Sequence, residues 1–207
     1  MEAIGVLENK WLKTRQFWEA KMARQGPSYV GRRGEDHNRQ GQRIEQLYWD
    51  RVGMGAYFPD ALDFGCGYGR FLSILSASCG HVWAVDMLES MLEHVRGAFP
   101  NVTAITAAWP PKLLNHDNSM DLLWGCLVFQ HITDDALFEA TTKELSRLLK
   151  PGARIIIIDN AVDQAPHVKP RGPEAIMKAL NAKVDHAEKV TINKRPEDHW
   201  LIDGRAE

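Results

Sequence analysis

The stretch Leu62–Phe71, "LDFGCGYGRF", places three glycines at every second position directly behind a short apolar segment. Glycines this dense weaken any helix or strand that contains them, because glycine loses more backbone freedom on folding than other residues. They therefore indicate a sharp turn, or a place where a ligand approaches the backbone closely. Acidic Asp63 lies two residues before the first of these glycines, Gly65. What binds at this turn decides the function of the chain.

Length and composition are typical of a globular protein. The chain has 207 residues, 44% of them hydrophobic, which is enough for one buried core and short for two. A net charge of −2 gives no general attraction to nucleic acids or membranes. The first 30 residues lack the apolar segment of a signal peptide, and Cys66, Cys79 and Cys126 lack metal-ligand spacing. We therefore expect a cytoplasmic protein with free thiols, no metal and no membrane partner.

From Ala61 onward, short apolar segments alternate with amphipathic ones. The segment 134–149 is the clearest helix, because it begins with acidic residues, carries a leucine stripe and stops at Pro151. Such alternation predicts an α/β fold, Rossmann-like and doubly wound around a mainly parallel sheet. The expected strands are 62–64, 81–85, 102–106, 122–128 and 154–158, and the expected helices are 69–78, 88–97, 134–149 and 173–183.

The two ends of the chain differ from this pattern. Segments 189–195 and 199–205 flank a turn at Pro196 and predict an antiparallel C-terminal hairpin. The first 55 residues are rich in Arg, Lys, Gln and Trp and predict two helices, near 7–24 and 38–53. We expect one domain over residues 1–207, in which 1–55 form a helical N-terminal cover and 56–207 form the core.

A turn from the first strand into the first helix brings backbone N–H groups and the positive end of the helix to one point. In doubly wound sheets, ligands lie beyond the carboxyl ends of the strands, where this turn is expected. The next predicted strand ends at Asp86, whose carboxylate can accept hydrogen bonds from two ribose hydroxyls. The pattern indicates a ligand that contains a nucleoside.

Two such ligands compete, a nicotinamide dinucleotide and S-adenosylmethionine. The dinucleotide pattern G-x-G-x-x-G requires glycine at position 70, where Arg70 would crowd the packing of helix on strand. The negative charge of Asp63 would not help a site to bind a pyrophosphate, which is also negative. The same charge can neutralise the ammonium group of an amino acid tail. The residues therefore favour S-adenosylmethionine.

Four segments in order give the chain its resemblance to the class I S-adenosylmethionine-dependent methyltransferases. They are "LDFGCGYGRF" (62–71), "VWAVDMLESML" (82–92), "HDNSMDLLWGCLVFQHI" (116–132) and "ELSRLLKPGARIIIID" (144–159). The third segment is similar to those of methyltransferases that act on small molecules. This resemblance implies a seven-stranded sheet whose last pair is antiparallel. It also implies methyl transfer to O or N of a small-molecule acceptor by in-line displacement.

The cofactor site expected from these motifs draws on several parts of the chain. The family often has an acidic residue after the third strand, but "AAWPP" (107–111) stands there, so backbone near Ala108 is expected to meet the adenine edge. Met87 or Trp109 would contact the adenine face, although Trp109 could equally pack in the core. Tyr29 and Arg33 could reach the cofactor carboxylate. The expected cofactor residues are Tyr29, Arg33, Asp63, Gly65, Cys66, Gly67, Arg70, Asp86, Met87, Ala108, Trp109 and Gly125.

Gln130 and His131 follow the fourth strand and are expected on the acceptor side of the transferred methyl. The ordinary pKa of histidine suits a base near neutral pH, which a hydroxyl or ammonium acceptor would need. His131 could instead only bond to backbone at a helix entrance, and both interpretations stay open. Cys126 lies within an apolar segment and is expected in the core.

The acceptor itself is not specified by any motif. The segment between Lys10 and Arg43 carries nine basic residues against few acids, which predicts either a solvated surface or attraction of an anionic acceptor. An RNA or protein methyltransferase that uses this segment, or a non-catalytic accessory subunit that binds the cofactor, are the alternatives. Nucleic acid is the less favoured acceptor, and the sequence does not predict an oligomeric state.

Overall fold

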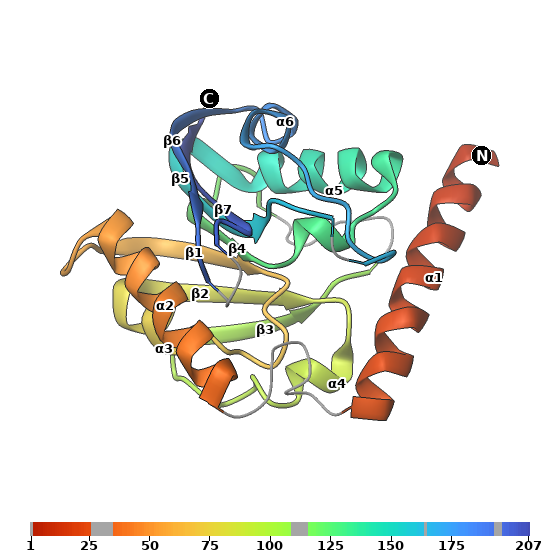
Figure 1. The fold of residues 1–207 in the computed structure, drawn as a ribbon, viewed down its shortest axis with the longest axis horizontal. Coiled ribbons are helices and arrows are strands. Elements are labelled where there is room, and N and C mark those ends of the chain that lie inside the picture. Colours follow the sequence, from red (N-terminus) through yellow and green to blue (C-terminus); the bar gives the residue numbers. More distant parts are fainter. Residues whose placement is uncertain (1, 26–34, 109–115, 164, 193–195) are drawn as a thin grey trace.

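The computed structural model describes residues 2–25, 35–108, 116–163, 165–192 and 196–207 (Figure 1). The helices are α1 (Glu2–Gln25), α2 (Glu35–Val52), α3 (Leu72–Ser78), α4 (Glu89–Leu92), the 3₁₀ helix η2 (Phe129–His131), α5 (Asp135–Leu148) and α6 (Pro173–Ala179). The strands are β1 (Phe58–Phe64), β2 (Cys79–Asp86), β3 (Val102–Thr106), β4 (Met120–Cys126), β5 (Leu149–Asn160), β6 (Ala182–Val190) and β7 (His199–Ala206). None of the described helices is long and apolar enough to cross a membrane.

All seven strands form one sheet in the order β3-β2-β1-β4-β5-β7-β6. Strands β1 to β5 are parallel, whereas β7 pairs antiparallel with both β5 and β6. The predicted α/β fold with a mainly parallel seven-stranded sheet and an antiparallel C-terminal hairpin is confirmed. Because the chain runs outward from β1 to β3 and then returns to β4 beside β1, the sheet has a switch point between β1 and β4.

The central strands are buried on both faces, which explains why they are nearly continuous apolar segments. Ile155 to Ile158 are fully inaccessible to solvent, as is the side chain of Trp124. One face packs against α2 and α3 and the other against α5 and α6, so the sheet lies between two helical layers (Figure 1). This three-layer core fixes the carboxyl ends of β1, β2 and β4 next to one another.

Several predicted element boundaries are wrong, mostly near the C-terminus. The helix predicted over 173–183 ends at Ala179, and the first hairpin strand is 182–190 rather than 189–195. Strand β6 is an edge strand with Lys, Asp and Glu at most of its exposed positions. Such charge on an edge protects against aggregation, and it also removes the apolar alternation that would identify a strand. The helix predicted over 88–97 is reduced to the single turn of α4 followed by further turns.

A buried ionic group ties α2 to the sheet at the end opposite the glycine turn. Asp203 on β7 accepts two hydrogen bonds from Arg154 on β5, at 2.9 and 2.6 Å, and one from Arg51 at 3.2 Å. Arg154 also donates to the Arg51 carbonyl at 2.6 Å. Since the Asp203 side chain is only 3% exposed, its charge depends on the two arginines for stabilisation.

Substituting Asp203→Ala should lower the free energy of unfolding by about 3–5 kcal/mol, because two guanidinium groups lose their buried counter-charge. Urea denaturation followed by circular dichroism measures this loss. Lys183→Ala is the control, since the Lys183–Glu207 pair is exposed and should contribute at most about 1 kcal/mol. Equal losses in both variants would contradict a structural role for the buried group.

Candidate functional site

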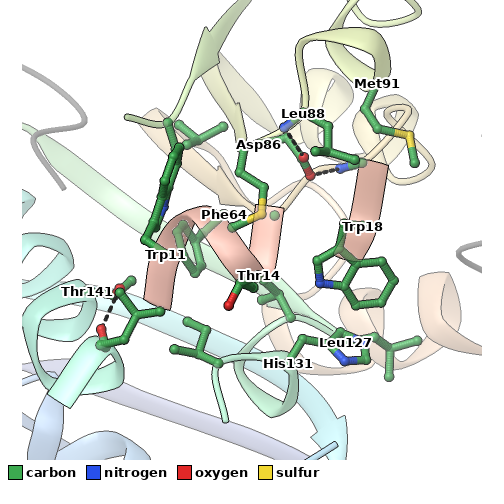
Figure 2. A pocket seen from close by; sticks show the side chains of 18 of the residues that line it. Trp11, Thr14, Trp18, Phe64, Asp86, Leu88, Met91, Leu127, His131 and Thr141 are labelled. Atoms are coloured by element: carbon green, nitrogen blue, oxygen red, sulfur yellow. Dashed lines mark hydrogen bonds between the residues drawn. The ribbon is translucent and has the colours of Figure 1, made fainter. Parts of the chain in front are cut away.

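A cavity of about 150 Å³ lies at the carboxyl ends of the strands, between the sheet and α1 (Figure 2). Helix α1 crosses this edge and contributes one wall, while the strand ends and the turns behind them contribute the rest. Its described lining consists of Trp11, Thr14, Trp18, Phe64, Gly65, Gly67, Val85, Asp86, Met87, Leu88, Met91, Ala107, Ala108, Cys126, Leu127, Val128, His131, Ile132, Leu137 and Thr141.

The glycine turn forms the floor of the cavity. Gly65 has φ +74°, and a Cβ there would lie 2.3 Å from Val128 Cγ2, so only glycine fits. Gly67 has φ +55°, but a Cβ there would meet nothing within 4 Å, because that side opens into the cavity. The first glycine is therefore required by packing, whereas the second leaves room for a ligand to approach the backbone.

Asp86 holds this turn from the end of β2. Its carboxylate accepts from the Gly67 N–H at 3.0 Å and from the Leu88 N–H at 2.9 Å (Figure 2). Burial raises the pKa of Asp86, and the backbone donors act in the opposite direction. Each carboxylate oxygen keeps a further lone pair, so two hydroxyl groups of a ligand can still bind.

Asp63 lies deeper, at the end of β1, and does not line the cavity. It is 3% exposed, and burial together with the charge of Asp86 raises its pKa to about 8. A buried carboxylate without an adjacent cation is costly to ionise. A bound ammonium group would supply that cation, and the site would then favour a zwitterionic ligand.

The walls of the cavity are mostly apolar. Trp11 and Trp18 come from α1, and Met87, Leu88 and Met91 come from the residues that follow β2. Flat apolar walls of this kind suit a planar heterocycle. Together with the open backbone at Gly67 and the carboxylate of Asp86, they fit an adenosyl group.

His131 ends η2 and lines the cavity beside Trp18, with the two ring centroids 4.6 Å apart. Its Nδ1 is 3.1 Å from the His167 carbonyl oxygen, and its Nε2 is 3.1 Å from the amide nitrogen of Gln130. Burial lowers the pKa of His131 to about 4. The ring is therefore neutral at physiological pH.

The structure brings part of the predicted site together. Gly65, Gly67, Asp86, Met87, Ala108 and His131 line the cavity, whereas Asp63, Cys66, Arg70, Gly125 and Gln130 do not. Tyr29, Arg33 and Trp109 lie outside the described residues.

Two of the residues that do not line the cavity have structural roles behind the turns. Arg70 donates to Gln40 at 2.9 Å and connects the glycine turn to α2. A Cβ at Gly125 would lie 2.7 Å from the Phe129 ring, so glycine permits the packing of η2 on β4. Both positions support the shape of the site from outside the cavity.

The α1 residues on the cavity wall were not predicted from the sequence. Trp11, Thr14 and Trp18 follow one another at spacings of three and four, which places them on one face of a helix. That spacing was the available signal. Leu127 was also missed: it lines the cavity with φ +57°, a strained conformation for a residue with a Cβ.

Comparisons with known proteins agree with this geometry. Residues 61–152 match the family model described as "Methyltransferase domain". A phosphoethanolamine N-methyltransferase of Triticum aestivum is 31% identical over 108 residues, which cover 50% of this chain and 21% of that protein. The resemblance to class I S-adenosylmethionine-dependent methyltransferases is thereby confirmed.

Two solved structures share the fold over most of the chain. The N-methyltransferase NodS from Bradyrhizobium japonicum, in complex with S-adenosyl-L-homocysteine, has a TM-score of 0.72 at 16% identity, covering 93% of this chain and 98% of that one. Haemonchus contortus phosphoethanolamine N-methyltransferase 1 has a TM-score of 0.73 at 15% identity, covering 98% of this chain and 50% of that one. The match to the curated plant relative covers about a fifth of that protein's length.

Protonation of Asp63 gives the site a measurable signature. Because its pKa is raised from 3.8 to about 8, the native state keeps a proton that the unfolded state loses between about pH 4 and 8. Stability therefore falls as pH rises through this window. Asp63→Asn should make this fall in stability less steep and be more stable than wild type at pH 8, by roughly 1–3 kcal/mol. Urea denaturation of both proteins from pH 5 to 8 tests this, and parallel curves would contradict it.

Proposed function

We propose that this chain, whose residues 61–152 match a methyltransferase domain, transfers a methyl group from S-adenosylmethionine to O or N of a small-molecule acceptor. The observation that carries the proposal is the cavity at the switch point of the sheet, where an open glycine turn meets the carboxylate of Asp86. An open glycine turn beside a carboxylate at the end of the second strand supports a donor that contains a nucleoside.

The residues present fit S-adenosylmethionine. Asp86 would bind the ribose hydroxyls, and Met87 with Leu88 would pack on the adenine. The backbone at Ala108 would meet the adenine edge, and Gly67 would admit the donor close to the turn. Asp63 would stabilise the ammonium group, which would in turn lower the raised pKa of this carboxyl. Tyr29, Arg33 and Trp109 remain part of this proposed site.

When bound, S-adenosylmethionine supplies an electrophilic methyl carbon, so the protein has little bond chemistry of its own to perform. Its residues act by positioning the reactants, which can contribute roughly 7–11 kcal/mol to lowering a barrier. Trp11 and Trp18 on α1 close one side of the cavity and limit the entry of water. Thr14 and Thr141 offer hydroxyl groups on the lining that can orient a polar acceptor.

The proposed acceptor is a small molecule. Relatives named for such acceptors, the phosphoethanolamine N-methyltransferases and a demethylmenaquinone methyltransferase, support this choice. The basic residues of α1 give limited support for an anionic acceptor, since Lys10 pairs with Asp134 at 2.5 Å and Arg15 with Glu19 at 2.8 Å. Nothing in the described geometry favours a nucleic acid or protein acceptor.

The division of the chain is part of the proposal. We take residues 1–207 as one domain in which 1–55 cover the cofactor, supported by the position of α1 against the cavity. We also propose a cytoplasmic location, supported by the free thiols of Cys66, Cys79 and Cys126.

S-adenosylhomocysteine at a hundredfold excess over its Kd should raise the Tm by roughly 5–10 °C, because a ligand that binds only the native state stabilises it. Asp86→Ala should weaken this binding by about 10- to 100-fold, as expected when hydrogen bonds to a charged group are lost. Differential scanning fluorimetry and calorimetry measure the two effects.

Glu93→Ala is the control for Asp86→Ala, because Glu93 is an exposed carboxylate in the turns that follow α4. It should bind S-adenosylhomocysteine as the wild type does. Stabilisation by a nicotinamide dinucleotide and not by S-adenosylhomocysteine would overturn the proposal. Label transfer from methyl-labelled S-adenosylmethionine to pools of small amines and alcohols then identifies the acceptor.

A further inference from the structure

The hydrogen bonds around Gln130 determine the orientation of its side-chain amide. Its Oε1 accepts a hydrogen bond from the backbone N–H of Asn160 at 2.9 Å, and the same N–H also donates to Asp159 Oδ1 at 3.1 Å. Since a backbone N–H can only donate, the atom facing it must be the amide oxygen, and the NH₂ group points the other way. Gln130 is buried, and its own backbone N–H donates to the Asp159 carboxylate at 2.8 Å, so the whole residue is fixed.

This orientation determines the protonation of His131. The NH₂ group of Gln130 lies 3.1 Å from Nε2 of His131, and because it can only donate, Nε2 must be the acceptor. On the other side of the ring, Nδ1 faces the His167 carbonyl oxygen at 3.1 Å, which can only accept. Nδ1 therefore carries the proton, and the lone pair of Nε2 is already used within the protein.

The charged and titratable groups around His131 also oppose a second proton. Burial is the largest effect that lowers the pKa of the ring, and the charges of His167, from the segment after β5, and of Lys21, from α1, act in the same direction. The hydrogen bond to the His167 carbonyl acts in the opposite direction and is outweighed by burial. Asp159 on β5 accepts a hydrogen bond from the backbone N–H of Gln130. Burial raises the pKa of Asp159 to about 7, so this carboxyl is only partly ionised near neutral pH.

We propose that His131 is a positioning residue, held by Gln130 and the His167 carbonyl as the neutral Nδ1–H tautomer, and that it does not act as a base. It connects the end of β4 to the segment after β5 and keeps the wall of the cavity beside Trp18 in place. The interpretation of its role in methyl transfer rests on the proposed function, whereas its tautomer does not.

The remaining titratable groups on the described lining do not replace it. Asp86 accepts two backbone N–H bonds at the turn, and in the proposed function its remaining lone pairs bind the ribose hydroxyls of the donor, so they are not available to an acceptor. Burial raises the pKa of the Cys126 thiol well above its ordinary value, so the thiol stays neutral. Within the described lining, no titratable side chain is then left to accept the proton of an alcohol.

These features assign an amine as the acceptor. An apolar cavity lowers the pKa of an amine and favours its neutral form. The nitrogen lone pair would form the new N–C bond while the electron pair of the C–S bond passes to sulfur. The methylated ammonium product would lose its proton to water after release. Trp11 and Trp18 provide aromatic surfaces that can stabilise the positive charge as it develops on nitrogen.

Nuclear magnetic resonance of protein labelled with ¹⁵N-histidine tests the tautomer directly. Long-range ¹H–¹⁵N spectra should show one histidine with protonated Nδ1 and unprotonated Nε2, unchanged from pH 8 to pH 5. His131→Asn assigns this histidine by the loss of its signals. A proton on Nε2, or titration between pH 6 and 7, would overturn the proposal whether or not the protein binds S-adenosylhomocysteine.

Two variants of similar size separate positioning from base catalysis. Asn can donate to the His167 carbonyl but cannot take up a proton, whereas Leu can do neither. With the acceptor found by label transfer, His131→Asn should keep activity within about tenfold of wild type and His131→Leu should fall below it. An equal loss of activity in both variants, by about 10²–10⁴-fold as expected when a catalytic base is removed, would overturn the proposal. Wild-type activity in both variants would overturn it too.

Matched amine and alcohol compounds test the acceptor class. Methyl-labelled S-adenosylmethionine should label the amine of each pair, with a rate that rises with pH as the free amine forms. Faster labelling of the alcohol would overturn the amine assignment. A protein that is not stabilised by S-adenosylhomocysteine at all would instead overturn the proposed function and leave the tautomer of His131 unaffected.

Discussion

The glycine turn depends on hydrogen bonds to the end of the neighbouring strand. The N–H groups of Gly65 and Cys66 both donate to the Val85 carbonyl, at 2.8 and 3.0 Å, and the Gly67 N–H donates to Asp86. The backbone that leaves β1 is thus held by β2, and the parallel pairing of these strands determines where the turn lies. Every feature of the cavity floor follows from this pairing, because it aligns the open side of Gly67 with the carboxylate of Asp86.

Burial of negative charge is the cost of this arrangement. Asp63 and Asp86 lie close enough for the charge of one to raise the pKa of the other, and burial raises both. A site that only needed stability would have a neutral residue at position 63. An ammonium-bearing ligand removes the conflict, so the same groups that destabilise the free protein would contribute to binding.

The sequence predicted the sheet because its central strands are short apolar segments of the length of fully buried strands, as Ile155 to Ile158 show. Strand prediction from the sequence failed where the packing does not require a continuous apolar segment, as in the charged edge strand β6. Within the site, the sequence motifs were sufficient to predict the glycine turn and Asp86 as parts of the cavity. Helix α1 carries no motif, and its place across the cavity arises from tertiary contacts such as that of Trp18 with His131.

His131 shows a further limit of sequence reasoning. Its position after β4 could be predicted, but its chemistry depends on which end of the Gln130 amide faces it. That orientation is set by the N–H of Asn160, thirty residues away in the chain and adjacent only because β5 lies beside β4. A histidine on the lining of the cavity suggests a base, yet one backbone donor on the neighbouring strand orients the Gln130 amide that engages its lone pair. The protonation state of a residue in a site is therefore a property of the fold around it.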